Sequence, residues 1–211
     1  MIGKILRRVL GSNERKIVNL YRSFFMDVDA VVTEISSTPG VRRYLEIGCG
    51  DGAISSLVAL RNENLSVTGI DISPFPGRLY SNLASVDYLQ IPTEAFVAEN
   101  AGSFDLVYIG DVLHHIEKDA EREAVLKAAA KALTITGSLI LKEWERRWSL
   151  YFLLGWLADR FITGDRVRYM TEKQIVRLLE SALPNFQIRK KGHFKPGPCN
   201  IFFVLQRDGY R

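Results

Sequence analysis

The stretch that decides the fold is Leu45-Glu46-Ile47-Gly48-Cys49-Gly50-Asp51-Gly52-Ala53, which leads into helical residues at 54–60. A short strand that runs into closely spaced glycines and then into a helix is typical of the first half of a nucleotide-binding βαβ unit. Glycine allows a tight turn and lets a ligand approach the backbone closely. We therefore predict that residues 48–52 form a cofactor loop.

Short apolar runs alternate with helical stretches around this loop. Strands are expected at residues 44–47, 66–70, 104–109 and 138–141, and helices at 53–62 and 119–133. Such alternation indicates βαβ units with a parallel sheet and right-handed crossovers. The stretch from residue 74 to 101 is less regular, and one further strand is expected there, around residues 78–84.

Amphipathic and capped segments lie on either side of this alternating region. Apolar side chains at helical spacing predict helices over residues 2–10 and 17–35, before any strand. Thr171-Glu172-Lys173-Gln174 is a capping-box pattern that opens a helix to about residue 182. Two final strands, at 186–191 and 201–206, are expected to form an antiparallel pair.

The composition of the 211 residues excludes several classes of protein. An apolar content of 47% with a net charge of +4 excludes disorder for the bulk of the chain. Two cysteines, Cys49 and Cys199, cannot build a disulfide scaffold. No apolar run reaches the roughly 18 residues of a membrane span, and the first residues lack the order of a signal peptide. We therefore expect a cytoplasmic location.

The positive charge is concentrated at the two ends of the chain. Residues 1–22 and 186–211 each carry +5, whereas residues 23–185 carry −6. An acidic middle argues against a nucleic-acid groove there, despite the basic isoelectric point. The basic helix at residues 2–10 either contacts an anionic membrane surface or packs on the domain with a solvated face.

An acidic residue follows the second strand at a spacing that suits a ribose. Asp71 lies 23 residues after Gly48, where a carboxylate can hold both ribose hydroxyls. Gly48-x-Gly50-x-x-Ala53 satisfies the dinucleotide fingerprint. Glu46 and a third glycine, Gly52, favour S-adenosylmethionine instead, because an acid beside the loop attracts a cationic methionine moiety and repels a pyrophosphate.

Residues 46–52 match in full the E/D-x-G-x-G-x-G motif, and the chain here resembles the class I S-adenosylmethionine-dependent methyltransferases. Residues 69–73 are similar to the family's ribose-binding second strand, and residues 104–116 to its fourth strand and substrate-facing loop. The motifs that carry the resemblance span about residues 44–143. Pro74–Gly77 departs from the family, because it leaves room for little more than a turn where a full helix is usual.

The resemblance implies an α/β fold with a Rossmann-like, doubly wound, seven-stranded sheet that is mostly parallel and has an antiparallel last strand. Residues 1–38 would form an N-terminal helical cover, and residues 39–211 the methyltransferase domain. It also implies a cofactor site in which Asp87, as the acid that ends the third strand, lies on the adenine side. The expected S-adenosylmethionine-binding residues are Glu46, Gly48, Cys49, Gly50, Gly52, Asp71, Ile72, Asp87 and Asp111.

His114 and His115 follow the fourth strand, at the mouth of the sheet where ligands bind. Either could take a proton from an acceptor, or could pack structurally, since methyl transfer often needs no strong base. Asp111 could orient a substrate or the amino group of the donor, or be a surface charge. Cys49 is expected to pack against the cofactor rather than act as a nucleophile, and no metal ligands are expected.

Residues 144–168 have the most unusual composition, with Trp144, Trp148, Tyr151, Phe152 and Trp156 among leucines. Residues 144–162 of this segment are expected to be helical with an interruption at Gly155. It is either a core helix or an apolar cover for the acceptor.

The expected function is methylation of an oxygen, nitrogen or carbon of a small or lipid-like acceptor. The alternatives are an NAD-dependent oxidoreductase and a non-catalytic protein that binds S-adenosylmethionine. The oligomeric state is left open.

Overall fold

The computed structural model describes residues 13–158, 160 and 167–209, so the expected helix at residues 2–10 lies outside the described part. Within it, one seven-stranded sheet has the order β3-β2-β1-β4-β5-β7-β6. β1 to β5 pair in parallel, and β7 runs antiparallel to both of its neighbours, as predicted. The strands are β1 (Arg43–Ile47), β2 (Ser66–Asp71), β3 (Asp87–Gln90), β4 (Phe104–Gly110), β5 (Leu133–Trp144), β6 (Phe186–Phe194) and β7 (Asn200–Arg207).

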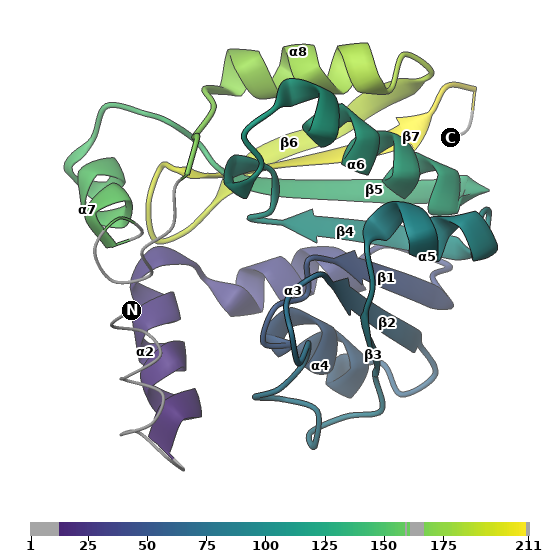
Figure 1. The fold of residues 1–211 in the computed structure, drawn as a ribbon, viewed down its shortest axis with the longest axis horizontal. Helices are drawn as coiled ribbons and strands as arrows, with labels where there is room; N and C mark the ends of the chain where they lie inside the picture. Colours follow the sequence, from purple (N-terminus) through teal and green to yellow (C-terminus); the bar gives the residue numbers. More distant parts are fainter. Residues whose placement is uncertain (1–12, 159, 161–166, 210–211) are drawn as a thin grey trace.

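Helices cover both faces of the sheet, while two others lie beyond one end of it (Figure 1). One face is covered by α3 (Val28–Ser36) and α4 (Ala53–Arg61). The other is covered by α5 (Thr93–Glu99), α6 (Asp119–Ala132) and α8 (Glu172–Ala182). The two helices beyond the end are α2 (Glu14–Phe25) and α7 (Leu150–Ala158).

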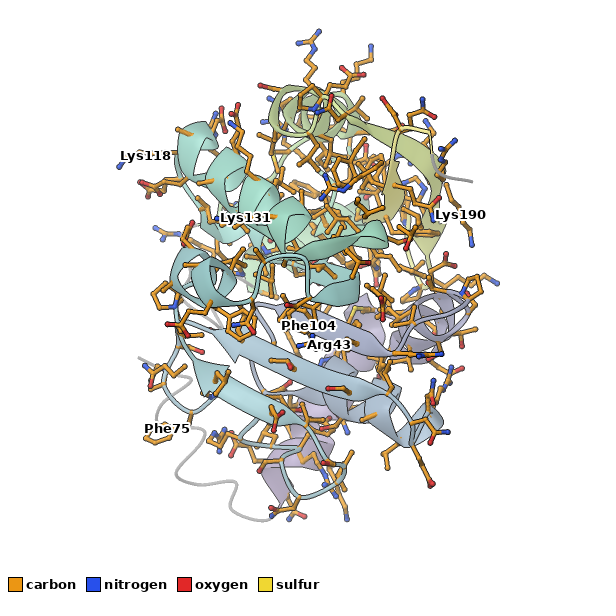
Figure 2. All side chains as sticks on the ribbon, turned by 90° about the vertical axis from the view of Figure 1, so that its right-hand side faces the viewer. Arg43, Phe75, Phe104, Lys118, Lys131 and Lys190 are labelled. Atoms are coloured by element: carbon orange, nitrogen blue, oxygen red, sulfur yellow. The ribbon has the colours of Figure 1, made fainter. Side chains whose placement is uncertain are left out.

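The alternation of side chains along the strands builds a separate core on each face. In β1, Leu45 and Ile47 belong to the cluster under α5, α6 and α8, whereas Tyr44 belongs to the cluster under α3 and α4. Successive residues of a strand point to opposite faces, so a doubly covered strand is apolar throughout. Lys118, Lys131 and Lys190 are examples of charged residues that lie exposed outside these layers (Figure 2).

The second expected helix is divided in two. α2 ends at Phe25, and the side chain of Asp27 caps α3 by accepting a hydrogen bond from the Ala30 amide at 3.0 Å. An aspartate at an N-cap satisfies one of the unpaired amides of the first turn, so it favours a new helix start. The expected interruption at Gly155 is wrong, because Gly155 lies inside α7.

The prediction of a strand at residues 78–84 is wrong. This segment forms turns, and the third strand is β3, four residues that are mostly exposed at the sheet edge. A short edge strand lacks the apolar alternation on which the prediction relied. Helix α5 was also missed. The capping box is confirmed, since the Thr171 and Gln174 side chains each pair with the other's backbone amide. Within the described residues, no helix is long and apolar enough to span a bilayer.

Candidate active site

The carboxyl ends of the parallel strands meet at one edge of the sheet. The glycine loop follows β1, and residues 111–115 follow β4, its neighbour in the sheet. The chain order reverses between β1 and β4, since β2 and β3 lie on one side and β5 on the other. Ligands of doubly wound folds bind in the crevice at such a switch point.

Each glycine of the loop has positive φ, but the three positions face different surroundings. A Cβ at Gly48 (φ 76°) would lie 2.3 Å from Val112 Cγ2, and one at Gly52 (φ 89°) would lie 2.5 Å from the Tyr88 hydroxyl. A Cβ at Gly50 (φ 52°) meets nothing within 4 Å. Gly48 and Gly52 therefore allow close packing of the loop, whereas Gly50 presents open backbone that a ligand can approach.

Glu46 lies beneath the loop rather than on its surface. Its side chain is buried and accepts a hydrogen bond from the Ser55 hydroxyl of α4. Burial raises the pKa of Glu46 to about 8, although the Ser55 hydrogen bond acts in the opposite direction. The carboxyl group therefore joins β1 to the first turn of α4, and its charge depends on pH near neutrality.

Asp71 holds the loop from the end of β2. Its Oδ2 accepts from the Gly50 amide at 2.8 Å, and its Oδ1 accepts from the Ser73 amide at 2.7 Å. Carboxylate oxygens have further lone pairs, so Asp71 can also accept from ribose hydroxyls. Ile72 comes next and is 76% exposed at the same edge.

Asp87 does not end the third strand, so that prediction is wrong. It is the first residue of β3 and pairs with Thr68, whereas Gln90 pairs with Asp71. In a parallel sheet this places Asp87 at the edge opposite the glycine loop. Gln90 is the strand residue that lies beside Asp71.

The loop fits the S-adenosyl group better than a pyrophosphate. The amides of Gly48 and Gly50 already donate to Ile70 O and to Asp71, so the loop has few amides to offer to phosphate oxygens. The carboxylate of Asp71 lies against the loop and would repel an anion. Open backbone at Gly50 beside a carboxylate suits a neutral ribose and a cationic amino-acid moiety.

Cys49 packs inside the site. It is 5% exposed, and burial raises the pKa of its thiol well above the ordinary value. A thiol that stays protonated is a poor nucleophile.

A second group of polar side chains follows β4 and ends β5. Glu143 Oε2 lies 2.7 Å from His114 Nδ1, and Glu143 Oε1 accepts from the amides of Val112 and Leu113. Asp111 pairs with the ammonium group of Lys142 at 2.5 Å. His114, Lys142 and Glu143 are all buried, so these contacts fix their orientations.

Further contacts hold the loop that carries His114. The buried Arg122 of α6 donates to Leu113 O at 2.9 Å and to Arg168 O at 3.0 Å. The Arg168 amide in turn donates to His114 O. The His114 ring stacks on Tyr169, with centroids 5.2 Å apart, whereas His115 is exposed. His114 is therefore the better held of the two histidines.

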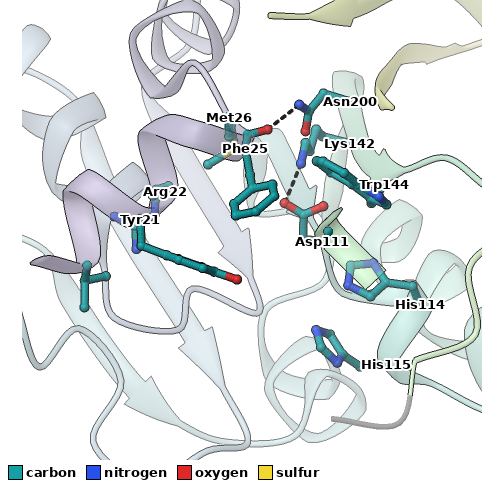
Figure 3. A pocket seen from close by; sticks show the side chains of 12 residues that line it. Tyr21, Arg22, Phe25, Met26, Asp111, His114, His115, Lys142, Trp144 and Asn200 are labelled. Atoms are coloured by element: carbon teal, nitrogen blue, oxygen red, sulfur yellow. Dashed lines mark hydrogen bonds and ion pairs between the residues drawn. The ribbon is translucent and has the colours of Figure 1, made fainter. Parts of the chain in front are cut away.

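A cavity of about 280 Å³ lies beside these groups (Figure 3). Aromatic side chains of α2 and β5 form part of its wall, and Asp111, His114 and His115 line it as well. Among the described residues, three buried polar atoms along it lack a hydrogen-bond partner: Asp111 Oδ1, Asn200 Oδ1 and Trp144 Nε1. Because an unpaired buried polar atom is costly, these atoms can receive a polar ligand at little desolvation cost.

Helix α2 is attached to the cofactor loop by charge. Arg22 pairs with Asp51 at 2.5 Å, and Arg78 contacts Glu14 with both guanidinium nitrogens. The same helix presents Tyr21 and Phe25 to the cavity. One element thus contacts both the glycine loop and the cavity.

Three side chains place ligand atoms close enough to hold a metal ion. One ligand atom each from Asp111, His114 and Glu143 lies within 4.8 Å of the others. These atoms already pair within the protein, because Glu143 accepts from His114 and two amides, and the Lys142 ammonium lies against Asp111. The contacts of these three side chains therefore fit a histidine fixed in one orientation at least as well as they fit a bound metal ion.

Sequence reasoning missed Arg22, Lys142, Glu143 and Asn200. The consecutive charges of Lys142 and Glu143, directly after a predicted buried strand at the ligand edge, were a usable signal. Arg22 and Asn200 carry no such signal, because their roles depend on how distant elements pack.

The chain is similar to several known proteins. The family described as "Methyltransferase domain" matches residues 45–139. The ubiquinone biosynthesis O-methyltransferase of Aromatoleum aromaticum is 29% identical over 153 residues, which cover 67% of this chain and 63% of that protein. The enzyme of the same name from Pseudomonas aeruginosa is 33% identical over 115 residues, which cover 52% and 47%. The chain thus spans less than two thirds of the length of these relatives.

Solved structures share the fold. The magnesium protoporphyrin IX methyltransferase of Synechocystis, with bound S-adenosylhomocysteine, aligns with a TM-score of 0.62 and 21% identity over 97% of this chain and 99% of that one. The 1,6-didemethyltoxoflavin-N1-methyltransferase of Burkholderia thailandensis gives 0.65 and 17% over 97% and 88%. The match of residues 45–139 to the methyltransferase-domain family and the complete glycine motif support a class I S-adenosylmethionine-dependent methyltransferase, and both of these solved structures contain S-adenosylhomocysteine.

Proposed function

We propose that this protein transfers the methyl group of S-adenosylmethionine to a hydroxyl oxygen of a small, partly apolar acceptor. The observation that carries the proposal is the His114–Glu143 pair, of which His114 lines the cavity. The names of the O-methyltransferase relatives support oxygen as the methylated atom.

The bound cofactor supplies an electrophilic methyl group on a sulfonium. The glycine loop and Asp71 hold the methionine and ribose parts, with Glu46 supporting the loop from below. Because a carboxylate only accepts, Glu143 keeps the Nδ1 proton of His114 in place and makes Nε2 the basic nitrogen. His114 then takes the hydroxyl proton while the oxygen–methyl bond forms and the sulfur–methyl bond breaks.

The lining of the cavity supports an acceptor that is both flat and polar. Tyr21, Phe25 and Trp144 line the cavity with aromatic side chains, which suits an aromatic or conjugated group. The partnerless Asn200 and Asp111 oxygens suit hydroxyl donors, and Trp144 Nε1 suits an oxygen acceptor. We further propose that α2, within the expected cover of residues 1–38, closes this cavity.

Product analysis tests the proposal. The protein is incubated with S-adenosylmethionine and matched single-ring compounds that carry a hydroxyl, an amine or neither, and products are weighed by mass spectrometry. The expected result is methylation of the phenols alone. Methylation of the anilines instead would show that the methylated atom is nitrogen and not oxygen. Binding of S-adenosylmethionine without any turnover would favour the non-catalytic alternative.

A further inference from the structure

Helix α7 exposes an unusual amount of apolar surface. Its nine residues carry no charge, yet only Gly155 and Ala158 are buried. Trp148, just before the helix, is fully exposed, and Leu150 is 73% exposed. A helix that is apolar all round normally lies in a core or in lipid. We define the α7 apolar face as Trp148, Leu150, Leu153, Leu154, Trp156 and Leu157.

The inner side of α7 is already seated on the protein. Tyr151, Gly155 and Ala158 recur at helical spacing, and the Tyr151 ring stacks on Trp144 with centroids 5.3 Å apart. A Cβ at Gly155 would lie 2.7 Å from Trp144. The Tyr151 hydroxyl also donates to Phe24 O at the end of α2. These contacts fix the orientation of α7. Its outer side remains available to a binding partner.

Helix α2, which the Tyr151–Phe24 hydrogen bond joins to α7, also exposes apolar side chains. Phe24 and Leu20 are 64% and 61% exposed, and α2 and α7 lie beyond the same end of the sheet (Figure 1). Large contiguous apolar patches on a protein surface mark interaction sites. A groove between α7 and residues 167–169 deepens the patch, with Trp148, Leu153 and Trp156 among its lining residues.

The charged residues around the α7 apolar face indicate which kind of partner binds it. Residues 146–168 contain five arginines and two aspartates. Arg146, Arg147 and Arg168 are exposed beside the apolar face, and Arg146 and Arg168 also line the groove. A second copy of the chain would bring arginines against arginines. Anionic lipid headgroups would pair with them while leucine and tryptophan side chains enter the interface, where tryptophan is favoured.

We propose that the α7 apolar face docks on an anionic membrane surface, with the arginines on headgroups and the apolar side chains at the acyl boundary. The inner side of α7 closes the acceptor cavity through Gly155 and Trp144. Docking would therefore hold that cavity close to the lipid phase. This inference goes beyond the proposed function and does not depend on methyl transfer.

Vesicle co-sedimentation of the full chain tests the proposal. The probes are vesicles of phosphatidylcholine alone and of phosphatidylcholine mixed with phosphatidylglycerol. We expect binding to the mixed vesicles, and a loss of about tenfold or more for Leu153→Glu, since the loss of one buried leucine side chain is of that order. Arg146→Gln with Arg147→Gln should reduce binding to mixed vesicles only.

A matched control is Ile135→Glu, because Ile135 is 63% exposed near the start of β5, at the other end of the strand from α7. It should bind as the unchanged chain does, and circular dichroism should show all variants folded. Equal pelleting of Leu153→Glu and the unchanged chain would overturn the proposal. So would binding that is lost only on removal of residues 1–11, or a lipid-free dimer that Leu153→Glu dissociates.

Discussion

The buried carboxyl group of Glu46, beneath the cofactor loop, makes the stability of the fold depend on pH. The group sits under the loop against Ser55, and burial raises its pKa from 4.5 to about 8. Between these values the folded protein keeps a proton that the unfolded chain loses. The stability contributed by this proton is complete below about pH 4.5 and is lost as the pH rises through about 8.

Replacing Glu46 with Gln should therefore flatten the pH dependence of stability. From about pH 5.5 to about pH 8, the unchanged chain should lose on the order of 2 kcal/mol more unfolding free energy than Glu46→Gln. Urea unfolding of the protein without cofactor at both pH values measures this. Parallel losses in the two proteins would mean that Glu46 is ionised throughout.

His114 provides the second test at the scale of one residue. His114→Gln should lower kcat by about 100-fold to 1,000-fold, since a general base contributes about that much. Glu143→Gln should cause a smaller loss and change the pH–rate profile, because it changes the partner of the His114 ring and leaves the ring itself in place. Affinity for S-adenosylhomocysteine, measured by calorimetry, should stay the same in both. An unchanged kcat in His114→Gln would give the histidine a packing role.

Two glycines of the loop have different roles. Gly48 allows close packing, whereas Gly50 presents open backbone to a ligand. Gly48→Ala should destabilise the protein by about 3 kcal/mol, because positive φ is combined with a clash against Val112. Gly50→Ala should cost only about 1 kcal/mol, since its Cβ meets nothing within 4 Å. It should nevertheless weaken S-adenosylhomocysteine binding at least tenfold. Thermal unfolding and calorimetry distinguish the two, and full binding by Gly50→Ala would place the ligand elsewhere.

Elements with a doubly covered apolar pattern could be predicted from sequence, and those governed by edges or caps could not. β1, β2 and β4 are short runs of mostly buried residues, and their predicted positions are confirmed. β3 is a short, exposed edge strand, and the search for an apolar run placed it several residues too early. That shift also misplaced Asp87, whose proposed role depended on the end of that strand.

The residues of the candidate site also fall into those that a local sequence pattern predicts and those that it does not. The glycine motif and Asp71 are local in sequence, so their spacing predicts that they lie together, and Asp71 accepts a hydrogen bond from the Gly50 amide. Glu143 and Lys142 could have been read from two charges that end a buried strand. Asn200 reaches the cavity only because β7 inserts between β5 and β6, and no local pattern encodes that topology.

For the whole molecule, α2 connects the N-terminal charge to the cofactor site. Arg22 contacts Asp51 within the glycine motif, so Arg22→Gln should weaken S-adenosylhomocysteine binding by about threefold to tenfold, with little change in unfolding midpoint. Arg61→Gln, which breaks the exposed pair of α4 with Asp29, is the matched control. Equal affinities of the two variants for S-adenosylhomocysteine would show that Arg22 of α2 does not contribute to cofactor binding.

We infer that the glycine loop binds the S-adenosyl group and not a dinucleotide. Calorimetric titration of the full chain with S-adenosylhomocysteine and, separately, with NAD tests it most directly. Saturable binding of S-adenosylhomocysteine, weakened by Gly50→Ala, with no heat from NAD, is the predicted result. Binding of NAD in the absence of any S-adenosylhomocysteine binding would contradict the account.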